Sequence, residues 1–381
     1  MIPASFSDYR ELARRRLPHV LFEYIDGGSG QETTLRGNME ALQRIALRQR
    51  VLRPVADIDL STELFGESLA MPLLLAPIGM GGMVRARGET LAVKAAEAAG
   101  LPMILSTVSV CGIEEVRRAA ERPIWFQLYM IRDRGYMRAL LDRAAAAGTR
   151  VLVFTVDLPI TGTRYRDIRS GLSGAQTAMG QVRRALDGLS HPAWMLDVWL
   201  QGRPHTYGNL VAAMPNASGA SDFAGWIARN FDPSISWDDL AWIREHWKGA
   251  IVIKGVLDPD DARECVRVGA DGLVVSNHGG RQLDGAPPSI EALPAIAEAV
   301  GDRLTVLMDG GVRSGQDVVR ALALGARACL IGRPWVYALA AQGQAGLAAA
   351  LASFAQEMRT TLALTGCNSV RAIGPELLVR G

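Results

Sequence analysis

The chain has 381 residues, of which 49% are hydrophobic and 21% charged, a composition typical of folded globular proteins and not of disordered ones. Its 41 lysines and arginines against 39 acidic residues give a formal net charge of +2. This balance excludes the strongly basic surface that nucleic-acid-binding proteins need, so no nucleic-acid partner is expected.

The sequence predicts neither a secretion signal, nor a membrane-spanning helix, nor a cysteine metal site. The N-terminal residues contain arginines but no continuous apolar stretch, so they predict no secretion signal. The apolar stretch from Trp335 to Phe354 is interrupted by Gln342 and Gln344, and it predicts a buried helix and not a bilayer span. The four cysteines have no metal-type spacing, so we expect reduced packing residues and no metal site.

Short, continuous apolar runs rich in Val, Ile and Leu recur through most of the chain. Such runs are typical of parallel strands that are buried on both faces. They lie at residues 72–76, 103–106, 124–128, 151–156, 251–254, 272–276, 304–308 and 328–331. All but one of the starts are 21 to 32 residues apart, which fits one strand, one helix and two short loops.

Helix punctuation lies between these runs. Asp258-Pro259 is typical of a helix start, and glycines at 100, 148, 269, 301 and 325 stand where helices should end. Eight successive βα units predict an α/β fold, a (β/α)₈ TIM barrel. A doubly wound open sheet is the alternative, but it leaves two strands unassigned, and no G-x-G-x-x-G follows the first strand.

The same spacing predicts one domain over residues 1–381. Residues 72–157 and 239–381 form the barrel, and residues 1–71 form an N-terminal helical decoration with a helix from Phe6 to Arg16. The one long interval, 100 residues, follows the fourth strand. It predicts an insertion over residues 158–238.

In such a barrel the chemistry belongs at the C-terminal ends of the strands. Polar or ionisable residues stand at nearly all of these ends, and a ring of them around one mouth implies a polar ligand. The strand ends are Ala76-Pro77, Ser106, Gln127 with Tyr129, Thr155 with Asp157, Lys254, Ser276-Asn277-His278, Asp309-Gly310-Gly311 and Gly332-Arg333.

The last two ends combine glycines with Arg313 and Arg333, a pattern that suits the phosphate site usual after strands seven and eight. Lys254 is one of only three lysines. It fits either a Schiff-base amine or a fixed cation beside a developing anion, and the residues alone leave both open.

His278 follows the sixth strand and precedes two glycines and Arg281. An imidazole could take a proton from a small substrate while a guanidinium binds its anionic group. Asp157 is the candidate that orients the imidazole. Tyr24, Tyr129 and Arg164 could add hydroxyl and cationic contacts.

Several longer motifs carry a resemblance to a known family. They are Ser-Asn-His-Gly-Gly-Arg-Gln-Leu-Asp from 276, Tyr-Ile-Asp-Gly-Gly from 24, Leu-Ser-Thr from 105, Trp-Phe-Gln-Leu-Tyr from 125, Thr-Val-Asp from 155 and Asp-Gly-Gly-Val-Arg from 309. The chain resembles the FMN-dependent L-2-hydroxy-acid dehydrogenases and oxidases, most closely the bacterial membrane-associated branch that oxidises L-lactate. The resemblance extends from the N-terminal Asp-Tyr-Arg to the final helix.

The resemblance implies an FMN-binding barrel and a role for each candidate. His278 would be the base and Asp157 its partner, and Lys254 would stabilise the anion of reduced flavin near its N1 atom, which decides against the Schiff base. The substrate would be held by Tyr24, Tyr129, Arg164 and Arg281. The cofactor would be held by Ala76, Pro77, Ile78, Ser106, Gln127, Thr155 and Ser276 along the ring and ribityl chain, and by Asp309, Gly310, Gly311, Arg313, Gly332 and Arg333 toward the phosphate.

The activity so implied is oxidation of L-lactate to pyruvate, with electrons passing from FMN to quinone or another membrane acceptor. His278 would take its proton from the α-carbon or from the hydroxyl. Gly79, which lacks a side chain, should leave room near the substrate. Alternatives are a dehydrogenase for L-mandelate or another larger acid, a soluble peroxide-forming oxidase, a Lys254 Schiff-base aldolase, and a non-catalytic barrel that binds a phosphorylated ligand.

The insertion predicts where the enzyme works. Between Gln176 and His205 it mixes apolar bulk, tryptophans and arginines, which suits a membrane interface. We expect peripheral attachment to the cytoplasmic side of the inner membrane and a homotetramer or larger homo-oligomer. We also expect that deleting residues 178–215 would release the protein from membranes and leave flavin reduction intact.

Overall fold

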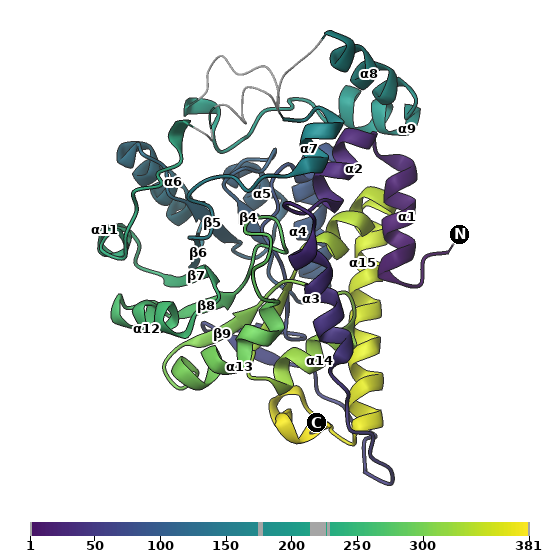
Figure 1. Ribbon diagram of the computed structural model, residues 1–381, viewed down its shortest axis with the longest axis vertical. Helices are drawn as coiled ribbons and strands as arrows, with labels where there is room; N and C mark the ends of the chain where they lie inside the picture. Colours follow the sequence, from purple (N-terminus) through teal and green to yellow (C-terminus); the bar gives the residue numbers. More distant parts are fainter. Residues whose placement is uncertain (1, 174–177, 214–225, 227–228, 380–381) are drawn as a thin grey trace.

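The structure is a computed structural model that describes residues 2–173, 178–213, 226 and 229–379. Its centre is a sheet of eight parallel strands in the order β3-β10-β9-β8-β7-β6-β5-β4 (Figure 1). A parallel bridge between Leu75 and Met103 links the edge strand β3 to the chain entering β4. The sheet thus closes on itself, and the predicted (β/α)₈ barrel is confirmed.

Each predicted strand coincides with a strand of the barrel. The strands are β3 (Leu73–Leu75), β4 (Ile104–Ser106), β5 (Trp125–Tyr129), β6 (Val151–Thr155), β7 (Ala250–Val256), β8 (Gly272–Val275), β9 (Thr305–Met308) and β10 (Ala328–Ile331). The helices that follow them are α4 (Gly88–Ala98), α5 (Ile113–Ala119), α6 (Arg134–Ala146), α11 (Asp239–His246), α12 (Pro259–Arg267), α13 (Ser289–Val300), α14 (Gly315–Ala323) and α15 (Arg333–Thr365). The strands are almost entirely buried because helices cover their outer face.

The N-terminal decoration holds more structure than the predicted helix. That helix is α1 (Phe6–Arg16), which begins at a capping box formed by Ser5 and Asp8. It is followed by α2 (His19–Asp26), α3 (Thr33–Arg44) and an antiparallel hairpin of β1 (Thr62–Leu64) and β2 (Glu67–Leu69). Phe65 in the hairpin turn packs on Trp125 inside the barrel, with ring centroids 5.6 Å apart. The hairpin therefore closes the N-terminal end of the barrel.

The final helix, α15, is the one helix in the described residues that is long and apolar enough to cross a membrane by length and composition. Half of its most apolar segment is buried within the molecule. Its backbone leaves helical geometry at Gln342 and Gly343, and it packs against α1, α4 and α14. These contacts agree with the predicted buried helix over Trp335–Phe354.

The insertion after β6 contains α7 (Tyr165–Ser170), α8 (Ala178–Leu189), α9 (Pro192–Trp194), the π-helix η2 (Met195–Leu200) and the 3₁₀ turn η3 (Val211–Ala213). It lies beside α1 and α2 (Figure 1). The Trp194 indole donates a hydrogen bond to the Met83 carbonyl at 2.8 Å. Asp197 forms ion pairs with Arg16 and Arg85 at 2.5 and 3.1 Å.

The return of the insertion to the barrel corrects one expectation. Asn209 is fully buried, donates to the Ser106 carbonyl at 3.1 Å and accepts from the Ile113 amide at 2.8 Å. Tyr207, two residues earlier, is also buried. Deleting residues 178–215 would remove these anchors from the end of β4, so we now expect the deletion to disturb the site as well as any membrane binding.

Candidate active site

A cavity of about 520 Å³ opens at the C-terminal ends of the barrel strands. Side chains from the N-terminal decoration, the strand ends and the insertion converge on it. Most residues predicted for the site line it: Tyr24, Ala76, Pro77, Ile78, Tyr129, Arg164, Lys254, His278, Arg281, Asp309, Gly310, Gly311, Arg313, Gly332 and Arg333.

The alternation of side chains along a strand explains why so many strand ends reach one place. The apolar cluster inside the barrel includes a residue from each strand: Leu74, Ile104, Trp125, Val153, Val252, Val274, Leu307 and Leu330. Two positions further along each strand stand Ala76, Ser106, Gln127, Thr155, Lys254, Ser276, Asp309 and Gly332. All of these were predicted to contact the cofactor, and they form the next inward layer, directly at the mouth.

His278 and Asp157 form the pair that the sequence predicted. The His278 Nδ1 atom lies 2.9 Å from Asp157 Oδ1. Burial alone would raise the pKa of Asp157, but the charge and hydrogen bond of His278, with the charge of Lys254, hold it below its ordinary value. Because an ionised carboxylate can only accept, Nδ1 carries the hydrogen and Nε2 is left to accept a proton.

The guanidiniums of Arg281 and Arg164 and the phenol of Tyr24 also line the cavity. Arg281 Nη1 donates to the carbonyls of Tyr24 and Gly27 at 2.6 and 2.8 Å, and its guanidinium lies 4.9 Å from the Tyr24 ring centroid. Arg164 Nε donates to the Arg281 carbonyl at 3.3 Å. Burial and the charge of Arg281 lower the pKa of Arg164 to about 10. These two cations repel each other, so a bound carboxylate would stabilise both.

Lys254 is buried with its charge paired. Its ammonium lies 2.9 Å from Asp309 Oδ2 and donates to Ser276 Oγ at 2.9 Å. Burial alone would lower the pKa of Lys254, but the charges of Asp309 and Asp157 raise it above the ordinary value. The ammonium is therefore a fixed cation at the cavity wall, a geometry that suits anion stabilisation and not nucleophilic attack.

The end of the cavity near β9 and β10 is built for close backbone approach and negative charge. Gly310 and Gly311 have φ of 96° and 88°, and a Cβ on Gly311 would stand 2.4 Å from the Asn38 carbonyl oxygen. Burial and the nearby Arg281 lower the pKa of Arg333 to about 9, and burial lowers the pKa of Arg313. No described carboxylate forms an ion pair with either arginine, so both cations suit a phosphate.

Buried polar atoms without partners test whether FMN fits here. Among the described residues, eight buried side-chain atoms lack hydrogen-bond partners. Four of them belong to predicted cofactor residues: Gln127 Nε2, Thr155 Oγ1, Asp309 Oδ1 and Arg313 Nε. A buried orphan atom costs about 1–3 kcal/mol unless a ligand satisfies it. The set offers donors and an acceptor beside the cavity and a guanidinium at the phosphate end, so the residues present fit the groups of FMN.

Not every predicted residue lines the cavity. Asp157, Ser106, Gln127, Thr155 and Ser276 lie directly behind it, where Asp157 holds His278, Ser276 holds Lys254 and Ser106 donates to Gln127 Oε1 at 3.1 Å. Ser106, Gln127, Thr155 and Ser276 belong to the inward layer and are buried, whereas Asp157 comes two residues after Thr155.

Other lining residues were missed, and most come from the insertion. Asp167 lies 3.7 Å from Arg164, and its place one helical turn later was a signal that could have been used. Tyr207 and Phe231 also line the cavity, and Phe231 packs on Tyr129 with ring centroids 4.9 Å apart. Nothing in their local sequence indicates a return to the barrel mouth.

Comparisons with known proteins identify the family of the chain. The family model described as FMN-dependent dehydrogenase matches residues 13–380. A protein named L-lactate dehydrogenase from Allorhizobium ampelinum is 57% identical, covering 100% of both chains. One of the same name from Caulobacter vibrioides is 58% identical, covering 99% of this chain and 98% of that one.

Solved structures of similar proteins indicate the same family. The monotopic membrane protein (S)-mandelate dehydrogenase superposes with a TM-score of 0.93 at 34% identity, covering 100% of both chains. Mandelate oxidase superposes with a TM-score of 0.83 at 38% identity, covering 99% of this chain and 98% of that one. The chain therefore belongs to the family of FMN-dependent dehydrogenases, and its cofactor is FMN.

Proposed function

We propose that this enzyme oxidises L-lactate to pyruvate. The observation that carries the proposal is that a His278–Asp157 pair faces the same cavity as Arg164 and Arg281. A 2-hydroxy acid needs both features, because a base must remove a proton while a cation holds the carboxylate. An aldolase would need a nucleophilic amine, and the ion pair of Lys254 with Asp309 argues against it.

Substrate binding follows from the charges. Arg281 and Arg164 bind the carboxylate through charge-assisted hydrogen bonds, each of order 1.5–3 kcal/mol. Tyr24 and Tyr129 offer hydroxyls at the same wall. Burial and the charge of Asp157 raise the pKa of Tyr129, so its hydroxyl stays protonated and can donate.

Proton transfer belongs to His278. Its Nε2 takes the proton, from the α-carbon or from the hydroxyl, and the Asp157 carboxylate stabilises the imidazolium that forms. FMN supplies the acceptor for the two electrons. Lys254 holds a positive charge where negative charge would develop on the cofactor.

The cofactor assignments rest on the same geometry. Arg313 and Arg333, with the amides of Gly310, Gly311 and Gly332, would hold the phosphate and the ribityl chain near it, beside Asp309. The ring and the rest of the ribityl chain would lie on the inward layer and its neighbours: Ala76, Pro77, Ile78, Ser106, Gln127, Thr155 and Ser276.

Substrate size separates the leading proposal from its runner-up. The relatives at 57–58% identity are named L-lactate dehydrogenases, whereas the structures at 34–38% identity act on mandelate by their names. Gly79 lines the cavity, and a Cβ there would stand 2.7 Å from Val108 Cγ2 and 3.4 Å from the Tyr24 hydroxyl. A side chain would therefore crowd the wall that faces the substrate.

Two measurements on the purified holoenzyme test the proposed reaction and the preferred substrate. The purified holoenzyme should be yellow, and its visible flavin absorbance should bleach when L-lactate is added without air. Comparing kcat/KM for lactate, glycolate, 2-hydroxybutyrate and mandelate should give lactate the highest value. A highest value for mandelate would support the runner-up, and a preference for glycolate over every larger acid would contradict both.

We also propose that quinone accepts the electrons at the cytoplasmic face of the inner membrane. Val182, Leu186 and Leu189 follow helical spacing on α8, and they are 53%, 61% and 62% exposed. Leu196, Trp199 and Leu200 of η2 are also exposed, and Arg203 stacks on Trp199 at 4.6 Å. An outward apolar stripe flanked by a cation suits a bilayer interface. The side chains of Met179 and Arg183 lie outside the described residues.

The homo-oligomeric state, a tetramer or larger, stays a prediction from the family resemblance. Size-exclusion chromatography with light scattering measures it directly. A monomer at all micromolar concentrations would contradict the prediction.

A further inference from the structure

Two residues of the proposed substrate site come from helices outside the barrel. Tyr24 lies near the end of α2 in the N-terminal decoration, and Arg164 is the N-cap of α7 in the insertion. Both line the cavity. Both residues are hydrogen-bonded to Arg281 in the loop after β8, and because neither belongs to a barrel strand, their relative position also depends on how α2 and α7 are joined.

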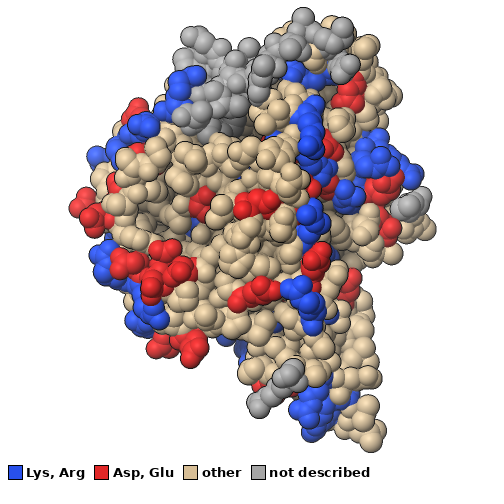
Figure 2. All heavy atoms as spheres, viewed as in Figure 1, with Lys and Arg blue, Asp and Glu red and all other residues tan. Residues whose placement is uncertain are grey.

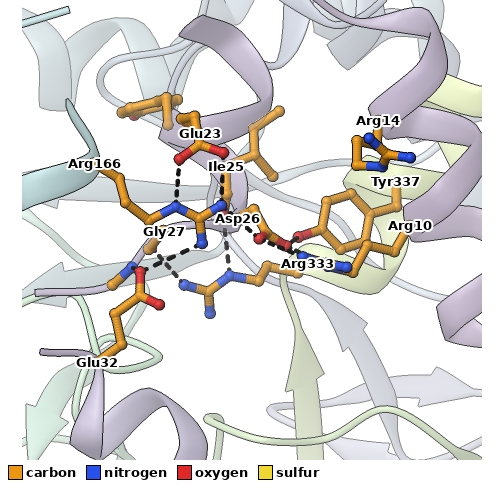
Figure 3. A network of polar contacts seen from close by, with 12 residues as sticks. Arg10, Arg14, Glu23, Ile25, Asp26, Gly27, Glu32, Arg166, Arg333 and Tyr337 are labelled. Atoms are coloured by element: carbon orange, nitrogen blue, oxygen red, sulfur yellow. Dashed lines mark hydrogen bonds and ion pairs between the residues drawn. The ribbon is translucent and has the colours of Figure 1, made fainter. Parts of the chain in front are cut away.

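Arg166 makes the ionic part of that joint (Figure 3). Beside it, the Gly30 amide and Ser29 Oγ donate to the Thr163 carbonyl at 2.8 and 3.1 Å. Its Nε and Nη2 atoms lie 2.6 and 2.8 Å from the two carboxylate oxygens of Glu23, a bidentate pair. Nη2 also donates to Asp26 Oδ2 at 2.8 Å, and Nη1 lies 3.4 Å from Glu32 Oε1. Glu23 and Asp26 stand on either side of Tyr24 in the chain, and Arg166 is two residues after Arg164. The ion pairs therefore join residues that lie within two positions of both substrate residues.

Asp26 is itself held rigidly from its other side. It is 7% exposed, accepts a bidentate pair from Arg10 at 2.6 and 2.7 Å, and accepts from the Tyr337 hydroxyl at 2.5 Å. Arg10 belongs to α1 and Tyr337 to α15, so Asp26 is anchored to two elements other than α7.

The joint lies behind the cavity and not in it. In the described part of the chain, the lining includes Tyr24, Arg164 and Asp167 but not Glu23, Asp26 or Arg166. A Cβ on Gly27 would stand 3.3 Å from Arg166 Cδ, so this backbone packs directly on the arginine. The Gly27 carbonyl in turn accepts hydrogen bonds from Arg281 and Arg333 at 2.8 and 2.9 Å.

We infer that Arg166 is a positioning residue, which clamps α7 onto α2 so that Arg164 and Tyr24 meet the same substrate carboxylate. The inference rests on the proposed oxidation of a 2-hydroxy acid and adds a residue that does not touch the substrate. Loss of one charge-assisted hydrogen bond to the carboxylate lowers affinity about 10- to 100-fold. Loss of the clamp should therefore weaken substrate binding while the His278–Asp157 pair stays in place.

The test compares Arg166→Met with Arg10→Met in the holoenzyme. Both variants remove an arginine from Asp26, but Arg10→Met leaves the α2–α7 joint intact. We expect Arg166→Met to raise KM for L-lactate about 10- to 100-fold, with a much smaller change in kcat. The dissociation constant of oxalate, followed by flavin absorbance, should rise in parallel. Arg10→Met should lower Tm and leave both values near those of the wild type.

A double variant separates positioning from general destabilisation. If Arg166 acts through Arg164, Arg164→Met/Arg166→Met should bind oxalate no more weakly than Arg164→Met alone. The inference would be overturned if the effects of the two single substitutions on oxalate binding multiplied in the double variant. An unchanged KM in Arg166→Met, or an equal rise in KM in Arg10→Met, would also overturn it. Glu23→Gln tests the same joint if Arg166→Met does not fold. If no 2-hydroxy acid bleaches the flavin of the wild-type enzyme, the proposed function is refuted instead.

Discussion

The backbone of His278 is left-handed, with φ of 57°, and the two glycines after it also have positive φ. For a residue with a Cβ this conformation costs about 1–2 kcal/mol. The His278 amide donates to Ser276 Oγ at 3.0 Å and the ring pairs with Asp157, and these bonds offset the cost. The turn brings the imidazole to the cavity at the end of β8.

His278→Gln should keep FMN and lose turnover. Glutamine can still hydrogen-bond to Asp157 but cannot take a proton, and removing a general base typically costs about 10² to 10⁴ in rate, or roughly 2.7–5.4 kcal/mol. The measurement is the rate of anaerobic flavin reduction by L-lactate in a stopped-flow instrument.

His246→Gln is the matched control, because His246 stacks on Trp242 and binds the Trp242 carbonyl away from the cavity. Its flavin should be reduced at the wild-type rate. A normal rate in His278→Gln would exclude that residue as the base.

At the scale of elements, the strands could be predicted because each is a short, continuous apolar run. Because both faces of each strand are apolar up to its last residue, the sequence did not indicate which side chains face the barrel interior. The β1–β2 hairpin was missed because three residues per strand show no clear alternation. Helices α2 and α3 were missed because neither has a side-chain N-cap hydrogen bond that local sequence would signal.

The junction of α1, α2 and α7 predicts a pH-dependent stability. Burial alone would raise the pKa of Asp26, but hydrogen bonds from Arg10 and Tyr337, with the charges of Arg10 and Arg166, hold it well below its ordinary value. Because the pKa of Asp26 is lower in the folded than in the unfolded protein, its charge stabilises the fold at pH values above the unfolded pKa of about 4. This stability is lost as the pH falls through the folded pKa.

Asp26→Asn should therefore destabilise the protein by about 3–5 kcal/mol near neutral pH, the typical cost of breaking a buried pair. The difference in Tm from the wild type should shrink as pH falls below about 4. Asp260→Asn, whose side chain is 89% exposed, should change Tm little at any pH. A difference in Tm that stays constant with pH would contradict the assignment of this stability to the Asp26 charge.

For the whole molecule, acidic and basic residues are interspersed on the face shown in Figure 2. No single-sign field covers that face, in line with the net charge of +2. The membrane attachment proposed above is therefore argued from the outward apolar stripe of α8 and η2 and not from charge. The path of the insertion back to the cavity could not be predicted, because Tyr207 and Phe231 reach it through tertiary contacts that leave no local pattern.

Val182→Glu/Leu186→Glu should release the protein from anionic vesicles while flavin reduction by L-lactate stays at the wild-type rate. Carboxylates on the exposed face of α8 oppose burial in a bilayer and repel its surface charge. Vesicle flotation measures the binding. Leu52→Glu is the control, because Leu52 is 100% exposed and lies between Arg50 and Arg53, which contact Gly366 at the C-terminal end of α15.

Unchanged flotation of the double variant would contradict the membrane assignment. Rapid stoichiometric peroxide formation by an intact enzyme that binds no membrane and reduces no quinone would make it a soluble oxidase.

Closure of the barrel has a consequence for synthesis of the protein. The strand that seals the sheet against β3 is β10, at residues 328–331, and the mouth draws one residue from every strand. A growing chain therefore has neither a closed sheet nor Arg333 until nearly all of it has left the ribosome. Contacts of such long range form late. FMN should thus be captured after release of the full chain, and until then the nascent strands need protection from one another.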